Sequence, residues 1–237
     1  MSCDFTYEHY KFILNQALSV GYNICGCFEY LNNDRKNKTI VMRHDVDKFP
    51  IRAYDFAEME YVCGIKSTYF FRVFSDEYNI FGYETMAIIK DIERMGHEIG
   101  YHAEPIDVSQ SYKEISPIEA FKMGKDALEL LLGHKIFGVA SHREATGYNN
   151  LTEFISKYKP IELDVMYEAY DNEILNLFNN SYYITDGYEW YWRSFRKGKI
   201  ISTTECLCKI LNQYENVIYC LTHPNSWYKH HYHRVKY

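Results

Sequence analysis

Basic residues, long apolar runs and linker-like segments are all scarce in this sequence. Its 26 lysines and arginines are outnumbered by 32 aspartates and glutamates, and the formal net charge is −6. A nucleic-acid-binding domain usually carries a basic footprint, so we expect no nucleic-acid partner. No stretch approaches the ~20 apolar residues that a helix needs to cross a bilayer, so we expect no membrane-spanning segment.

The first residues also lack the positively charged and apolar pattern of a secretory signal, which favours a cytoplasmic protein. Linkers, low-complexity segments and close repeats are missing too. We therefore expect one domain over residues 1–237, with an N-terminal helical extension over 1–37 and a tail over 228–237. The tail is rich in aromatic residues and histidine and is interpreted as a frayed terminus or a metal-binding segment. The oligomeric state stays open.

The cysteine content favours reduced thiols. Seven is an odd number, so at least one thiol is free or pairs between chains. Cys25-Gly-Cys27 and Cys206-Leu-Cys208 invite a metal-binding interpretation, but they lack the two-residue gap typical of zinc knuckles. Because cysteine often serves as a small core hydrophobe, we interpret these pairs as structural.

Tyrosine is the compositional outlier, with 24 copies. Its ring can stack on the apolar face of a sugar while its hydroxyl finds a polar partner, so the composition suits a sugar-binding groove. The alternative is that tyrosine replaces phenylalanine in the core and on the surface.

Strand-like and helix-like segments alternate along the chain and are joined by short loops. This alternation predicts parallel strands with right-handed crossovers. The leading architecture is a single-domain distorted β/α barrel of about seven parallel strands, and an open doubly wound sheet is the alternative. We expect helices over 7–20, 51–63, 83–94, 117–132 and 203–214, and strands over 38–47, 67–73, 98–102, 136–141, 163–166, 182–185, 199–202 and 217–221.

The strand over 38–47 ends in two aspartates, Asp45 and Asp47. Alternate side chains of a strand point to the same face, so both carboxylates leave the strand on one side, together with Arg43. Two like charges at this spacing raise each other's pKa unless a cation or a shared proton intervenes. The pair therefore indicates a metal site or a division between base and ligand, unless both side chains are simply solvated.

Polar residues also follow the other predicted strands. In parallel β/α folds the functional residues gather at the carboxyl ends of the strands. Nearly every expected strand end delivers a metal-ligating or acid–base residue, which favours a shared site: His102 and Glu104, His142 and Arg143, Asp164, Asp186, and His223.

Three of these segments resemble the polysaccharide deacetylases of carbohydrate esterase family 4, which share a NodB-type domain. Arg43-His-Asp-Val-Asp47 is similar to the first motif of that family, Gly96-His-Glu-Ile-Gly-Tyr-His102 to the second, and Leu221-Thr-His-Pro224 to the last. Ser141-His-Arg143 and the segment 182–190 are similar to a divergent cytoplasmic branch associated with surface-polysaccharide synthesis. The resemblance covers about residues 38 to 227.

The resemblance implies a metal-dependent deacetylase of a sugar or of a nucleotide- or lipid-linked sugar precursor. It makes Asp45 the catalytic base, Asp47 and His102 metal ligands, and His223 the general acid. Asp164 or Asp186 would orient His223, and Arg43 or Arg143 would orient Asp45. A divalent metal, with zinc favoured, is the implied cofactor. Substrate contacts are expected from Arg43, Tyr101, Glu104, Trp190 and Trp227.

One position departs from the family pattern. The usual second histidine of the second motif is replaced by Ile106. The third ligand therefore comes from elsewhere, and His142 is favoured over Glu104 because imidazole is a common zinc ligand. A weakly held metal, removal of another acyl or amide group, and a catalytically silent carbohydrate-binding barrel are the alternatives.

Overall fold

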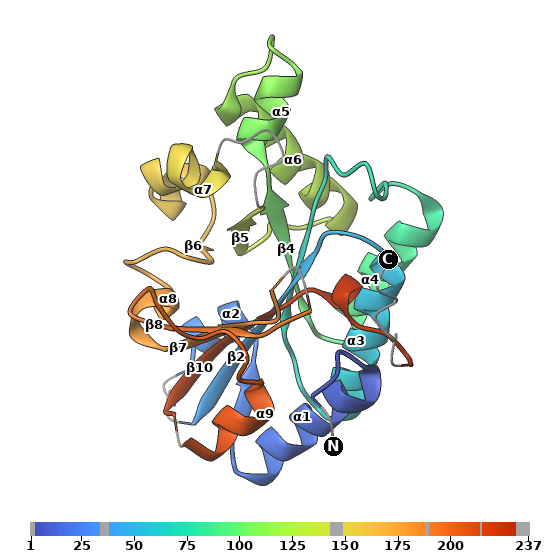
Figure 1. The fold of residues 1–237 in the computed structure, drawn as a ribbon. Helices are drawn as coiled ribbons and strands as arrows, with labels where there is room; N and C mark the ends of the chain where they lie inside the picture. The colour runs from blue at the N-terminus through green and yellow to red at the C-terminus, as the bar shows by residue number, and fades with distance from the viewer. Residues whose placement is uncertain (1–2, 34–37, 143–148, 188–189, 214, 231–237) are drawn as a thin grey trace, which may run out of the picture.

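The computed structural model describes residues 3–33, 38–142, 149–187, 190–213 and 215–230. The described chain folds into one mixed sheet of ten strands, and the longer helices pack around its outside (Figure 1). The strands are β1 (Asn23–Cys25), β2 (Thr39–Val46), β3 (Thr68–Phe71), β4 (Glu98–Ala103), β5 (Gly138–Ser141), β6 (Tyr167–Glu168), β7 (Tyr182–Thr185), β8 (Arg193–Arg196), β9 (Lys199–Ser202) and β10 (Val217–Thr222).

The helices alternate with the strands over most of the chain. They are α1 (Tyr7–Ser19), α2 (Cys27–Leu31), α3 (Pro50–Val62), α4 (Tyr83–Arg94), α5 (Pro105–Ser111), α6 (Pro117–Leu132), α7 (Asn150–Glu153), α8 (Leu177–Asn180) and α9 (Leu207–Ile210). Short 3₁₀ helices cover Ile155–Lys157, Pro160–Leu163, Leu211–Gln213 and Pro224–Ser226. Within the described ranges, none of the helices combines the length and the apolar composition needed to cross a bilayer.

The strand order β6-β5-β4-β3-β2-β10-β7-β8-β9 places β2 near the middle of the sheet, and β1 pairs with the first half of β2. All strand pairs from β6 to β7 in this order are parallel, and β7, β8 and β9 form antiparallel pairs. Among the described residues no backbone pairing joins β6 to β7, so hydrogen bonds do not close the sheet there. The mostly parallel α/β architecture is thus as expected, whereas barrel closure is not observed.

Every residue of β2 is buried, because side chains pack on both faces of the strand. Ile40, Met42 and Val46 belong to the core between the sheet and the outer helices. Val41 faces the opposite way, into a smaller core inside the curved sheet. Residues of β6, β7 and β10 also belong to this inner core. Side-chain packing therefore connects β6 to β7, although no backbone hydrogen bonds join these strands among the described residues.

Several helix ends follow the local signals in the sequence. Thr6 caps α1 by accepting from the His9 backbone N–H, and Ser116 and Glu119 form the expected capping box of α6. Gly133 ends α6 with φ +81°, a left-handed conformation that suits a residue without a Cβ. The main expected helices therefore begin and end close to their predicted positions.

Some expected elements are wrong. Residues 163–166 do not form a strand, because the chain makes a 3₁₀ helix over Pro160–Leu163 and pairs with β5 only from Tyr167. The Ser202 hydroxyl accepts from the backbone N–H groups of Thr204 and Glu205, and α9 begins only at Leu207. Besides the helix α1, the N-terminal part of the chain contributes the strand β1, which joins the sheet. The sequence pattern does not predict the short elements α2, α5 and β8, because their hydrophobic periodicity is weak.

A buried polar network joins α3 to the outer face of the sheet at Glu60. Its carboxylate accepts hydrogen bonds from the hydroxyls of Tyr10 (2.5 Å), Tyr69 (2.7 Å) and Ser67, and contacts His44 Nε2 at 2.9 Å. Burial alone would raise the pKa of Glu60, but His44 and the other partners outweigh it and lower the pKa to about 2. The ionised carboxylate therefore stabilises the fold at neutral pH.

We expect Glu60→Gln to reduce the free energy of unfolding at pH 7 by about 3 kcal/mol or more, because it leaves buried donors facing an amide. The depressed pKa means that this stabilisation is present above the ordinary glutamate pKa and is lost as the pH falls toward 2. Urea unfolding measured at several pH values would test both points. Asp91→Asn, which disrupts the exposed pair with Arg94, is the control and should cost below about 1 kcal/mol.

Candidate active site

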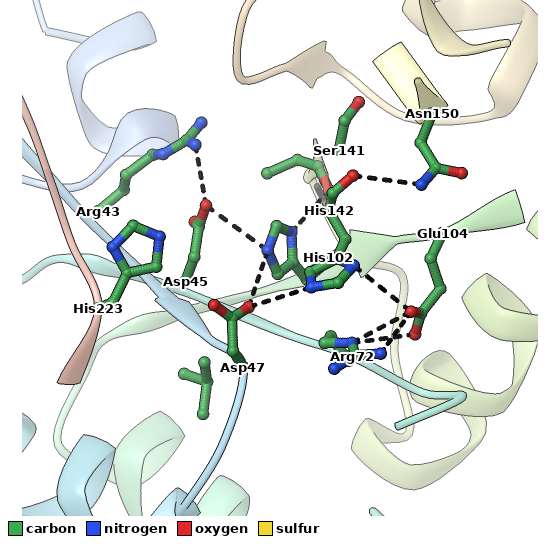
Figure 2. Close-up of polar contacts among 12 residues, drawn as sticks. Arg43, Asp45, Asp47, Arg72, His102, Glu104, Ser141, His142, Asn150 and His223 are labelled. Carbon is green, nitrogen blue, oxygen red and sulfur yellow. Dashed lines mark hydrogen bonds and ion pairs between the residues drawn. The ribbon is translucent and has the colours of Figure 1, made fainter. Parts of the chain in front are cut away.

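The two aspartates at the end of β2 lie in a buried polar site at the carboxyl edge of the sheet (Figure 2). Arg43 lies two residues before Asp45 on the same face of β2, and its Nη2 donates to Asp45 Oδ2 at 3.0 Å. The guanidinium is fully buried and also donates to the hydroxyls of Tyr170 (2.8 Å) and Tyr219 (3.1 Å). Arg43 therefore holds the Asp45 carboxylate in a fixed orientation.

Asp47 lies beside two histidines from neighbouring strand ends. His102 on β4 places Nε2 3.3 Å from Asp47 Oδ1, and His142, directly after β5, places Nε2 3.6 Å from the same oxygen. The two imidazole rings are nearly perpendicular, with centroids 5.0 Å apart. One ligand atom from each of Asp47, His102 and His142 thus lies within 4.8 Å of the others.

A hydrogen bond orients the His102 ring, and a carboxylate lies behind the His142 ring. His102 Nδ1 lies 3.0 Å from the carbonyl oxygen of Ala140, which leaves Nε2 free to act as a ligand. His142 Nδ1 lies 3.5 Å from Glu104, and Arg72 holds that carboxylate with a 2.6 Å contact. A carboxylate behind a histidine is a common arrangement around metal ligands.

Asn150 fixes the backbone next to the same site. It is fully buried and donates to the carbonyl oxygen of His142 at 3.2 Å, while its Oδ1 accepts from the Ile106 backbone N–H at 2.9 Å. The Ile106 side chain belongs to the apolar core. His142 therefore lies close to Asp47 and His102, whereas the residue at the usual ligand position packs elsewhere.

The donor set fits a divalent cation. Asp47 Oδ1 is buried, has no hydrogen-bond partner among the described residues, and faces two imidazole nitrogens. Burial and the adjacent His102 lower the pKa of His142 to about 3, so its ring is neutral and keeps a lone pair at neutral pH. Burial opposes ionisation of Asp47, but His102 and the other nearby histidines lower its pKa below the usual range. Burial disfavours the charged form of His102, but the carboxylates of Asp45 and Asp47 outweigh burial and raise its pKa, so a bound metal would displace its proton. One carboxylate and two imidazoles match the ligand types of catalytic zinc sites.

His223 approaches the aspartates from the end of β10 (Figure 2). Its Nδ1 lies 2.6 Å from Asp186 Oδ1, and its backbone N–H donates to Asp186 Oδ2 at 2.8 Å. The Trp227 indole N–H donates to the same Oδ2 at 2.9 Å. Asp186 is fully buried, so this arrangement fixes both the carboxylate and the ring orientation of His223.

The charge state of His223 follows from these neighbours. Burial disfavours its imidazolium form, but the Asp186 carboxylate, followed by those of Asp47 and Asp45, outweighs burial and raises the pKa to about 9. His223 therefore holds a proton at neutral pH, and it lies across the two aspartates from His102 and His142 in Figure 2.

Several expected site residues lie elsewhere. Asp164 follows a 3₁₀ helix before β6, and its carboxylate contacts Lys125 at 2.9 Å and Lys135 at 2.7 Å, so Asp186 rather than Asp164 contacts His223. Tyr101 points to the opposite face of β4 from His102 and packs against α6 in the outer core.

The other expected substrate contacts are also revised. Arg43 and Trp227 are fully buried and hold Asp45 and Asp186, respectively, so neither side chain is available to a substrate. Glu104 is buried against Arg72 and His142. Trp190 is 46% exposed and lies near Tyr228, so it remains a candidate for a sugar contact. Arg143 lies outside the described residues.

The sequence did not point to Arg72, Asn150 or Glu168. Glu168 ends β6, and burial raises its pKa to about 7 despite the nearby Arg43 and the backbone donor of Tyr170. Arg72 follows β3 directly, so the rule that functional residues follow parallel strands could have identified it. Asn150 gave no such signal, because its role depends on tertiary contacts with α5 and with the backbone of His142.

No family model and no curated protein matches the sequence. The Streptococcus pyogenes deacetylase PplD in complex with acetate is similar in structure, with a TM-score of 0.48, 17% identity, and coverage of 70% of this chain and 76% of that chain. The chitin deacetylase from the fungal pathogen Colletotrichum lindemuthianum has a TM-score of 0.32, 14% identity, and coverage of 43% and 44%. At these values the likeness assigns no activity to this chain, and its function has to be inferred from its own site.

We expect Asp186→Asn to lower the pKa of His223 from about 9 toward the ordinary histidine value near 6.5, or below it. The negative charge that favours the imidazolium is lost while the burial penalty stays. NMR titration of the histidine ring protons in chelator-treated protein would measure this, with His223→Gln to assign the signal. Asp164→Asn is the control and should leave the pKa unchanged; an unchanged pKa in Asp186→Asn would contradict the assignment.

Proposed function

We propose that the protein is a metal-dependent hydrolase that removes the N-acetyl group from a sugar. The observation that carries the proposal is the arrangement at the carboxyl edge of the sheet. A three-residue ligand group, a carboxylate held by a buried arginine and a protonated histidine held by a buried aspartate all face one another. These parts match the requirements of amide hydrolysis: an activated water, a base and an acid for the leaving amine.

Asp47, His102 and His142 are the residues that would hold the metal, and zinc suits this ligand set. When bound there, the ion would lower the pKa of a water molecule and polarise the acetamide carbonyl. Glu104 and the Ala140 carbonyl would keep the two imidazole rings in the ligating orientation.

Asp45 is proposed as the general base. One of its oxygens, Oδ2, is held by Arg43, whereas Oδ1 is buried without a hydrogen-bond partner among the described residues. That free oxygen can accept a proton from the attacking water. The contact with Arg43 fixes the orientation of the carboxylate.

His223 is proposed as the general acid. It holds a proton at neutral pH, and it would transfer that proton to the sugar nitrogen as the bond between nitrogen and the acetyl carbon breaks. The water proton thus ends on Asp45 and the His223 proton ends on the amine, while acetate leaves. Asp186 keeps the imidazolium in position and is a positioning residue, since its contacts go to His223 and Trp227.

The sugar carrier and the compartment are further parts of the proposal. Trp190 is a half-exposed ring that could stack on a sugar face, which supports a carbohydrate over a peptide substrate. All seven cysteines are free thiols, which supports a reducing compartment such as the cytoplasm and, with it, a nucleotide- or lipid-linked sugar precursor as substrate.

We expect Asp45→Asn to reduce deacetylation by about 10²- to 10⁴-fold while zinc stays bound, because the amide cannot accept the water proton. Asp47→Asn and His142→Ala should lose both zinc and activity, and a chelator should abolish activity of the unmodified protein. Acetate release from N-acetylglucosamine oligomers and nucleotide-linked N-acetylated sugars, measured together with zinc content, would test this.

Asp164→Asn is the matched control, since it changes a carboxylate that contacts lysines instead of the site. It should retain both zinc and activity. Full activity in Asp45→Asn would refute the proposed base. Cleavage of another acyl group instead of N-acetyl would keep the site chemistry and change the substrate. An unloaded site in excess zinc would support a silent carbohydrate-binding protein.

A further inference from the structure

The helices α1 and α9 lie side by side (Figure 1), and a second group of histidine and cysteine side chains that could hold a metal lies between the segments around them. We name it the thiol cluster, and it shares no residue or strand end with the candidate active site. Its members come from three separate segments, and their ligand atoms all lie within 4.8 Å of one another: Cys3, His9, Cys206 and Cys208.

The distances within the thiol cluster are close to those of a tetrahedral metal site. Bond lengths of about 2.3 Å for zinc–sulfur and about 2.0 Å for zinc–nitrogen place neighbouring ligand atoms roughly 3.5 to 3.8 Å apart in a tetrahedron. Cys3 Sγ lies 3.6 Å from Cys208 Sγ, and His9 Nε2 lies 3.2 Å from Cys206 Sγ. Only small side-chain shifts would be needed to enclose an ion.

Core packing alone does not explain this convergence. His9 is 2% exposed, its Nδ1 has no hydrogen-bond partner among the described residues, and its Nε2 faces the Cys206 thiol. Buried polar groups normally have better partners. A disulfide would use two of the sulfurs and leave the third thiol and the imidazole without a role, and the 3.6 Å separation exceeds a disulfide bond length of about 2.0 Å.

A hydrogen bond next to the cluster already connects α1 to α9. Gln16 on α1 donates to the carbonyl oxygen of Cys208 at 3.0 Å, which fixes α9 against α1. Lys209 directly follows Cys208 in the sequence, so a lysine lies next to the cluster. Three thiolates and zinc together carry one negative charge, so a nearby lysine is a suitable neighbour.

We propose that the thiol cluster holds a structural zinc ion. Its three sulfurs and one imidazole complete the coordination shell, so no position is left open for a substrate, as is typical of structural sites. The ion would tie the segment before α1 to α9. That segment packs Phe5 against Trp227, with ring centroids 5.0 Å apart, and Trp227 in turn holds Asp186. The ion would therefore brace the outer side of the His223–Asp186 pair without joining the reaction.

Cobalt substitution tests the proposal by a signal that depends on sulfur ligands and not on activity. The full chain, purified under reducing conditions and stripped of metal, should bind Co²⁺ with a thiolate-to-cobalt charge-transfer absorption that added Zn²⁺ removes. We expect about one such site per chain. Asp47→Asn should keep this absorption, so failure of the proposed active site would leave the result unchanged.

Cys206→Ser combined with Cys208→Ser should lose the charge-transfer absorption and about one equivalent of zinc. Cys3→Ser, which changes the partly exposed ligand, should weaken it even if the double variant fails to fold. Cys63→Ser is the matched control, because Cys63 is a partly buried free thiol outside the cluster, and it should behave like the unmodified protein. Absence of the absorption in the folded, reduced unmodified protein would overturn the proposal, as would a disulfide within the cluster that persists under those conditions.

Discussion

Two carboxylates at the end of one buried strand place like charges close together, and the other residues of the site provide partners that offset the repulsion. Asp45 and Asp47 are 3% and 6% exposed, so water does little to separate their charges. Buried like charges raise each other's pKa unless positive groups lie close by. Arg43 provides the compensation for Asp45 from within the same strand, and the histidines of β4 and β5 face Asp47. The two aspartates thus have different partners and are suited to different tasks.

The supporting contacts are as important as the residues that face the reaction. His102, His142 and His223 each use Nδ1 to contact an oxygen behind the ring, which leaves Nε2 directed into the site. Arg72 stands behind one of these carboxylates and Trp227 behind another. A site held at this many points loses little conformational entropy when a substrate binds, which favours catalysis.

Much of this arrangement follows from local sequence signals. The alternation of strands and helices indicated a mostly parallel α/β sheet, and the rule that functional residues follow parallel strands pointed to Asp45, Asp47, His102, His142 and His223. Helix caps such as Ser116 and Gly133 are local interactions, so their positions were predictable. The rule failed at Asp164, because the predicted strand before it is a 3₁₀ helix and the true β6 begins at Tyr167.

The sequence by itself determined the strand that carries the two aspartates, the helices around it and the residue types available at the strand ends, because these depend on hydrophobic period, caps and turns. Only the tertiary structure decided which residues the side chains at the strand ends contact. Asp164 was a candidate partner of His223, yet it contacts Lys125 and Lys135, and Trp227, expected to contact substrate, is buried against Asp186. The thiol cluster draws on segments about 200 residues apart, so local pattern could not reveal it. Contacts between distant segments depend on how the whole chain packs, and no local period encodes them.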